Sequence, residues 1–153
     1  MGANYKQLTE FQKKIEKLNN DQKEEFLEAC CKELAARLLA KVIKRTPSDT
    51  GVLRRGWTGG VKENATAYAN SLSVKHEGGK YHIDIINPVE YASYVEYGHR
   101  QTPGRYVPEL GKRLKQGWVQ GKFMLTISEN ELNQMSDKIL QAKLNKFMKE
   151  VFK

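Results

Sequence analysis

The sequence predicts an α+β domain in which long helices pack against a small antiparallel β-sheet, with a long irregular loop before the C-terminal helix. Three observations support this prediction. Apolar residues recur at helical spacing near both ends, two alternating stretches flank a glycine turn in the middle, and glycine and proline are dense at 99–121. With 153 residues, 39% of them hydrophobic, the chain is expected to fold as one domain spanning residues 1–153.

Two helices are predicted in the N-terminal third. Within residues 5–18, apolar side chains recur at steps of three and four: Leu8, Phe11, Ile15 and Leu18. A longer helix is predicted to begin at Asn20 or Asp21, either of which can cap it. It should end at Thr46-Pro47, because proline disfavours helical geometry in the residue before it.

The middle of the chain predicts a β-hairpin. Residues 72–74 and 81–85 alternate between apolar and polar, and the turn-forming stretch 77–80 separates them. An earlier strand is expected at 55–61, where glycines interrupt the pattern. Residues 90–97 have helical spacing, and Gly98 is placed to end this short helix.

The last helix should follow the irregular stretch 99–121. Ser128 is expected to cap it, and Glu131 stands three residues later, as in a capping box. Loops as long as 99–121 are usually functional or mobile.

The net charge of +8 favours an acidic partner, such as nucleic acid or an acidic protein surface. The one local concentration is residues 98–122, with six basic side chains against Glu109. This stretch is either a solvated rim or an anion-facing surface. Cys30 and Cys31 are adjacent, which disfavours a disulfide between them. We therefore expect reduced thiols in a soluble intracellular protein with no signal peptide and no membrane segment.

No catalytic residue, cofactor site or metal site is predicted. His76 and His82 flank the hairpin turn and lack a third ligand at metal-binding spacing. Neither cysteine has a histidine near it in sequence, and the glycines at 56–60 lack the lysine of a phosphate-binding loop. A small nuclease using His99 and Arg100 is the enzymatic alternative.

A first motif occupies residues 46–57. Asp49 and Gly51 can turn the chain sharply, after which Leu53 and Trp57 return to the core. Arg54 and Arg55 cannot both be buried cheaply, so at least one should face solvent or a partner.

A second motif occupies residues 91–100. Tyr91 and Tyr94 are expected to be core residues, although tyrosine is also favoured at interfaces. Base stacking by these rings is a third option, which Glu90 and Glu96 weaken because they would repel phosphate.

These two motifs resemble those of a tailed-bacteriophage head–tail joining family. The matching patterns are Pro47-Ser48-Asp49-Thr50-Gly51-x-Leu53-Arg54-x-x-Trp57 and Tyr91-Ala92-x-Tyr94-Val95-Glu96-x-Gly98-x-Arg100. A third motif, Gly121-x-Phe123-Met124, is similar to another landmark of the family. The resemblance spans roughly residues 5–150.

The resemblance implies a structural phage or prophage protein of the neck or tail-completion type, without enzymatic activity or cofactor. Its expected partners are itself in a ring and phage connector, tail-tube or tail-terminator proteins, near packaged DNA and without a membrane. It would assemble in the bacterial host cytoplasm and reside in the virion neck or tail. The alternative is a small basic nucleic-acid-binding module with residues 98–122 facing phosphate.

The expected interface residues are Arg54, Arg55, Glu96, His99, Arg100 and Arg105. The residues expected to set the motifs in place are Asp49, Gly51, Leu53, Trp57, Tyr91, Tyr94 and Gly98.

Overall fold

The computed structural model describes residues 20–48, 50–61 and 64–152. The predicted helix at 5–18 and the predicted role of Asp49 lie outside these residues. The elements are α2 (Asn20–Arg45), α3 (Val52–Gly56), α4 (Ala65–Ser71), β1 (Lys75–Glu77), β2 (Lys80–His82), α5 (Ala92–Tyr97), β3 (Gly98–Arg100), β4 (Tyr106–Val107), β5 (Lys112–Arg113), β6 (Trp118–Gln120) and α6 (Met124–Val151).

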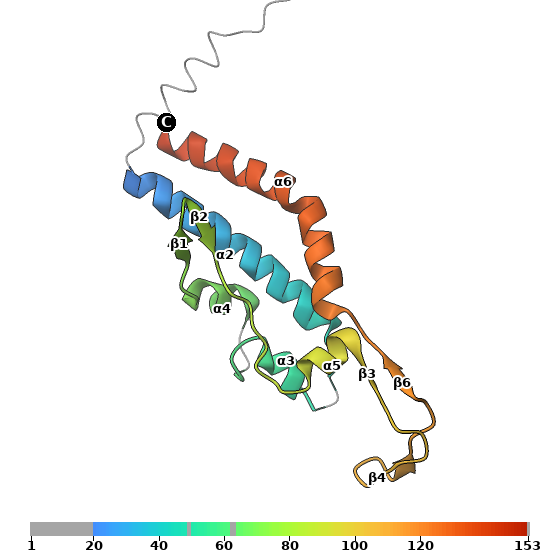
Figure 1. Ribbon diagram of the computed structural model, residues 1–153. Coiled ribbons are helices and arrows are strands. Elements are labelled where there is room, and N and C mark those ends of the chain that lie inside the picture. Colours follow the sequence, from blue (N-terminus) through green and yellow to red (C-terminus); the bar gives the residue numbers. More distant parts are fainter. Residues whose placement is uncertain (1–19, 49, 62–63, 153) are drawn as a thin grey trace, which may run out of the picture.

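Two long helices, α2 and α6, run side by side in opposite directions (Figure 1). The predicted end of α2 is confirmed, and its acidic first turn and basic last turn suit the helix dipole. After Arg45 the chain leaves the helix at Thr46-Pro47, as expected. The short helix α4 packs along α2, where Lys32 Nζ donates to the Asn70 carbonyl at 3.1 Å.

The main core lies around the end of α2. Leu39 and Val42 are fully buried there, and Leu53, Trp57 and Met124 close over them from α3, the turn after it and α6. Each of these side chains removes apolar surface from water, at about 25 cal/mol per Å² buried.

The stretch 55–61 is not the strand that the sequence predicts. It holds the end of α3 and a series of turns, in which the Thr58 hydroxyl bonds to the carbonyls of Arg55 and Val61. Helix α4 was not expected; the Asn64 side chain caps it by accepting from Thr66 N at 2.8 Å.

The predicted hairpin is present, but its strands are β1 and β2 rather than 72–74 and 81–85: the first predicted strand lies wholly before β1, and the second overlaps β2 only at residues 81–82. Gly78 and Gly79 both adopt positive φ in the turn, which suits a tight two-residue connection. The rings of His76 and Tyr81 stack at 4.1 Å between centroids.

Residues 98–120, here called the arm, form a folded β structure rather than an irregular loop. β3 pairs with β6 and β4 pairs with β5, both antiparallel. Backbone bonds between the two pairs, such as Gln101 N to Gly117 O at 2.9 Å, join them into one long hairpin. The α+β class is confirmed, and the antiparallel strands form three separate pairs.

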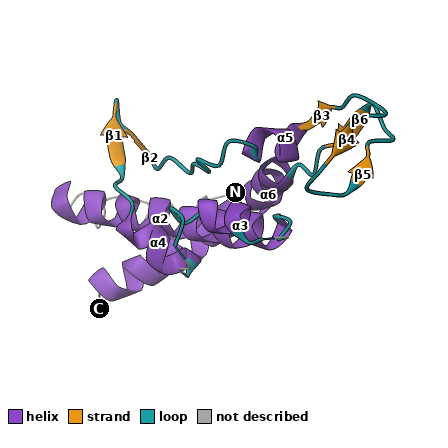
Figure 2. Cartoon of the chain, turned by 90° about the horizontal axis from the view of Figure 1, so that it is seen from below, coloured by secondary structure: helices purple, strands orange, loops and turns teal. Residues whose placement is uncertain are grey.

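The arm projects from one end of the helical body, and the β1–β2 hairpin lies toward the other end (Figures 1 and 2). The molecule therefore presents two different β structures at opposite ends.

Candidate functional site

The three sequence motifs meet at one place, here called the junction, where α2, α3, α5 and α6 converge. Its centre is the fully buried Thr46 hydroxyl. This hydroxyl donates to Val42 O at 2.6 Å, accepts from Trp57 Nε1 at 2.9 Å and lies 3.3 Å from Met124 Sδ. Residues from the first and third motifs are thus joined through one side chain.

The first motif is held by its own side chains. Arg54 is half-buried, and its Nε donates to Thr46 O at 2.6 Å, which ties α3 to the end of α2. Asn87 Nδ2 donates to Leu53 O at 2.8 Å from the segment before α5. Arg54, expected at the interface, is therefore engaged inside the protein.

Arg55 remains exposed, and its Nη2 reaches Thr50 O at 3.4 Å. It lies beside Gly51, the N-cap residue of α3, whose φ is +78°. Leu53 and Trp57 are buried, as the motif predicts.

The second motif joins the third through a buried carboxylate. Glu96 is only 5% exposed, so it does not lie on the interface side where we expected it. Its Oε2 accepts from Leu125 N and its Oε1 from Thr126 N, both at 2.9 Å. These amides belong to the first turn of α6, whose donors lack partners within the helix.

This arrangement explains why α6 begins four residues before the predicted cap. Phe123, at the N-cap position, has φ of +47° and makes no side-chain cap bond. Ser128 lies inside the helix and its hydroxyl donates to Met124 O at 2.6 Å. Glu131 pairs with Arg45 and Lys41 on α2 instead of closing a capping box.

Two glycines allow the arm to leave the junction. A side chain on Gly98 would place its Cβ 2.4 Å from Val119 O, and one on Gly121 would place it 2.5 Å from Glu96 O. Both positions require the absence of a side chain because the opposing atoms are backbone. Lys122 N and Phe123 N then bond to the carbonyls of Val95 and Glu96.

The arm is basic and carries exposed aromatic rings. Arg100 and Arg105, both expected at the interface, are exposed on it. So are Tyr106, Leu110 and Trp118, with Trp118 49% exposed. Large apolar and cationic side chains on one projecting element are typical of a binding surface.

Histidine 99 occupies the base of the arm in β3. It is half-buried, and its ring lies 5.6 Å from that of Tyr94. Its Nδ1 is buried and has no hydrogen-bond partner among the described residues.

The tyrosines of the second motif are not core residues. Tyr94 is 58% exposed, and Tyr91 and Tyr97 are exposed too. Helical spacing suggested burial, but α5 buries its other side through Glu96 and contacts of Ala92 and Val95 with the core. The tyrosines therefore extend the exposed aromatic surface toward the arm.

Sequence reasoning missed Thr46, Asn87, Ser128 and Gly121 as junction residues. Because Thr46 precedes a proline, the sequence indicates only that a helix ends there. No local pattern predicts its hydrogen bond with the indole of Trp57. In the part of the chain that the structure describes, no three His, Cys, Asp or Glu side chains are grouped to hold a metal ion. Among those same residues, no helix is long and apolar enough to cross a membrane.

Fold and junction together define a small α+β protein whose helical body holds a projecting, basic β-arm. A family model described as "Bacteriophage HK97-gp10, putative tail-component" matches residues 9–98. The chain belongs to this family of phage tail components. The match ends where the arm begins, so the arm and α6 lie outside it. Neither the curated proteins nor the solved structures contain a match to the chain.

Proposed function

We propose that this chain is a structural subunit of the phage head–tail junction, of the neck or tail-completion type. It works as one domain over residues 1–153, assembles into a ring and docks to connector and tail-tube or tail-terminator proteins. Assembly takes place in the bacterial host cytoplasm, and the product resides in the virion neck or tail. The observation that supports this proposal is the arm, which is exposed, basic and aromatic yet anchored at a buried junction.

The composition of the arm favours a protein contact. Tyrosine, tryptophan and arginine are the residues that contribute most often to binding energy at interfaces. Tyr106 and Trp118 expose about half of their surface, and Arg100 and Arg105 lie on the same element. Burying these rings against a neighbour would remove apolar surface from water.

The anchorage of the arm favours binding as well. Elements that are ordered before binding lose less conformational entropy on association. The hydrogen bonds that Glu96 accepts from the start of α6 and the close approach of Gly98 to Gly121 hold the base of the arm. The tip is cross-braced by Arg113 Nη1, which donates to Gly104 O at 2.8 Å.

The position of the arm suits a ring. A ring is built by head-to-tail contacts, so each subunit needs two different faces. The arm lies at one end of the body, far from the β1–β2 hairpin (Figure 2). If the arm of one subunit contacts the body of the next, the two subunits use different surfaces for this contact.

The test is sedimentation velocity over a concentration series, repeated with the connector and tail-tube proteins of the same phage. Arg100→Glu/Arg105→Glu should abolish the assemblies that the unaltered protein forms. Lys138→Glu/Lys149→Glu makes the same change of charge on exposed positions of α6 and should leave them intact. Absence of assembly under both conditions, or equal loss in both variants, would contradict the proposal.

Nucleic-acid binding by the arm is a second candidate. Six basic residues against Glu109 in 98–122, with Trp118 exposed among them, could contact phosphate and stack on a base. Fluorescence anisotropy with a DNA duplex should then show affinity that falls steeply with salt. Lys112→Glu/Lys115→Glu should remove it, and Lys138→Glu/Lys149→Glu should not. Absence of binding at low salt eliminates this candidate.

A further inference from the structure

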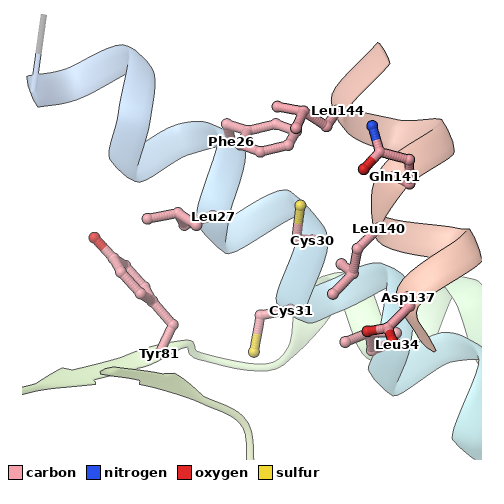
Figure 3. A pocket seen from close by; sticks show the side chains of 10 residues that line it. All are labelled: Phe26, Leu27, Cys30, Cys31, Leu34, Tyr81, Asp137, Leu140, Gln141 and Leu144. Carbon is pink, nitrogen blue, oxygen red and sulfur yellow. The ribbon is translucent and has the colours of Figure 1, made fainter. Parts of the chain in front are cut away.

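An apolar groove of about 610 Å³ lies between the first half of α2 and the second half of α6 (Figure 3). Phe26, Leu27 and Leu34 line it from α2, and Leu140 and Leu144 line it from α6. Leu27 is 41% exposed. The groove is far from the arm and the junction, so the proposed function does not account for it.

A second hollow of about 400 Å³ shares Phe26 with the groove. Ala29, Phe147 and Val151 contribute apolar surface to it, but charged side chains such as Glu25 and Lys146 line it too, so the apolar lining belongs to the groove itself. The rings of Phe26 and Phe147 stack at 4.4 Å between centroids. The apolar lining of the groove suits a helix laid along it.

We propose that the groove is the docking site of residues 5–18 of the same chain, folded back along α2 as an amphipathic helix. The apolar stripe of this segment is formed by Leu8, Phe11, Ile15 and Leu18. Asn19 connects this segment to α2, which begins at Asn20, and asparagine favours both turns and helix caps. Helices joined by so short a connection pack as an antiparallel pair.

The lengths agree with this arrangement. At about 1.5 Å per residue, a helix over residues 5–18 spans about 20 Å. Folded back from Asn20, it would reach Leu34, where the groove ends on α2. In this register Ile15 lies opposite Phe26, and Phe11 lies opposite Cys30.

The charges are complementary. Residues 5–18 hold four lysines and two glutamates, and residues 20–34 of α2 hold five acidic and two basic side chains. Burial, and after it the nearby charges of Glu24 and Glu28, raise the pKa of Tyr81, which lines the groove. Asp137 lines the groove from α6. An apolar helix face rimmed by lysines therefore fits the α2 side of the groove, where most of the acidic side chains lie.

The two cysteines of the chain report on the occupant, because both line the groove. The experiment follows their reaction with a maleimide in the full chain at fixed pH. Phe11→Asp should speed labelling at least about ten-fold, equal to roughly 1.4 kcal/mol of docking free energy lost. Thr9→Asp makes the same new side chain on the opposite side of the predicted helix and should label as slowly as the unaltered chain.

Fast labelling of the unaltered chain, or slow labelling of Phe11→Asp, would overturn the proposal. So would protection that grows with protein concentration, because a second copy would then cover the groove. A second measurement does not depend on the Phe11→Asp variant. In Phe11→Cys/Cys31→Ser, a short bis-maleimide should join position 11 to Cys30 within one chain, and in Thr9→Cys/Cys31→Ser it should not; linkage between two chains would contradict the proposal.

Discussion

Glu96 binds Thr126 twice, through the backbone amide at 2.9 Å and the hydroxyl at 2.7 Å. Glu96 belongs to the second motif, and Thr126 lies in the first turn of α6, just after the third motif. A carboxylate at a helix N-terminus satisfies orphan amides and interacts favourably with the helix dipole. The contact therefore joins two motifs that stand about thirty residues apart and sets the direction in which the arm leaves the body.

Replacing Glu96 should destabilise the protein through the loss of this cap. Glu96→Gln keeps one acceptor oxygen and removes the charge, while its new amide faces donors. We expect the free energy of unfolding in urea to fall by about 2 kcal/mol, the range for buried hydrogen bonds to charged groups. Glu90→Gln, an exposed position just before α5, should change it little. Equal stability of the two variants would show that the cap contributes nothing.

The Thr46–Trp57 bond should appear as coupling in a double-mutant cycle. Thr46→Val leaves the buried indole N–H without its acceptor, which costs about 1–3 kcal/mol. Once Trp57→Phe has removed that donor, the same change should cost about 1 kcal/mol less. Thr46→Val combined with Ser136→Ala, on a distant part of α6, should be additive. A cycle without coupling would remove Thr46 from the centre of the junction.

Gly98 should be intolerant of a side chain for a reason that Gly104 does not share. Both have nearly the same positive φ, +86° and +85°, but a Cβ on Gly104 meets nothing within 4 Å. Gly104→Ala thus measures backbone strain alone, and Gly98→Ala adds the collision with Val119 O. In hydrogen exchange, Gly98→Ala should speed the β3–β6 amides more than about ten-fold over Gly104→Ala. Similar rates in both variants would contradict close packing at the base of the arm.

The Glu131 ion pairs should make stability depend on pH. Hydrogen bonds from Arg45 and Lys41 hold the pKa of this carboxyl below its usual range. Such a group binds fewer protons when folded, so its contribution is complete above the ordinary glutamate pKa and is lost as pH falls through the lowered one. Urea unfolding of the protein and of Glu131→Gln should therefore converge between about pH 5 and pH 3.

Glu129→Gln, an exposed neighbour on α6, controls for charge in this pH series. It should leave the pH dependence of the unaltered protein in place. A difference between the protein and Glu131→Gln that is constant over the whole range would refute the link to titration.

Elements with local signals were predictable from the sequence. The end of α2 follows from the Thr46-Pro47 stop, and the glycine pair at 78–79 defines the hairpin turn. The start of α6 was predicted wrongly because its cap comes from Glu96 on another element. The residues next to Ser128 in the sequence do not indicate that Glu96 caps the helix.

The arm and the orientation of α5 could not be read locally either. Gly98 pairs with Gln120 across a stretch whose strands are two or three residues long, too short for alternation to be recognised. Tyr91 and Tyr94 have core-like spacing, yet the buried face of α5 is the one with Glu96, whose partners are distant in sequence. The burial of Glu96 can be understood only once the amides of Leu125 and Thr126 are known to donate to it.

The central claim, that the arm contacts a neighbouring subunit, is tested most directly by site-specific photocrosslinking. A benzophenone amino acid replaces Tyr106 on the arm or, as a control, Gln134 on the exposed side of α6. Under the conditions in which the protein assembles, illumination should produce covalent oligomers from position 106 and none from position 134. Assembled protein that yields no oligomers from position 106, or equal amounts from both positions, would contradict the account.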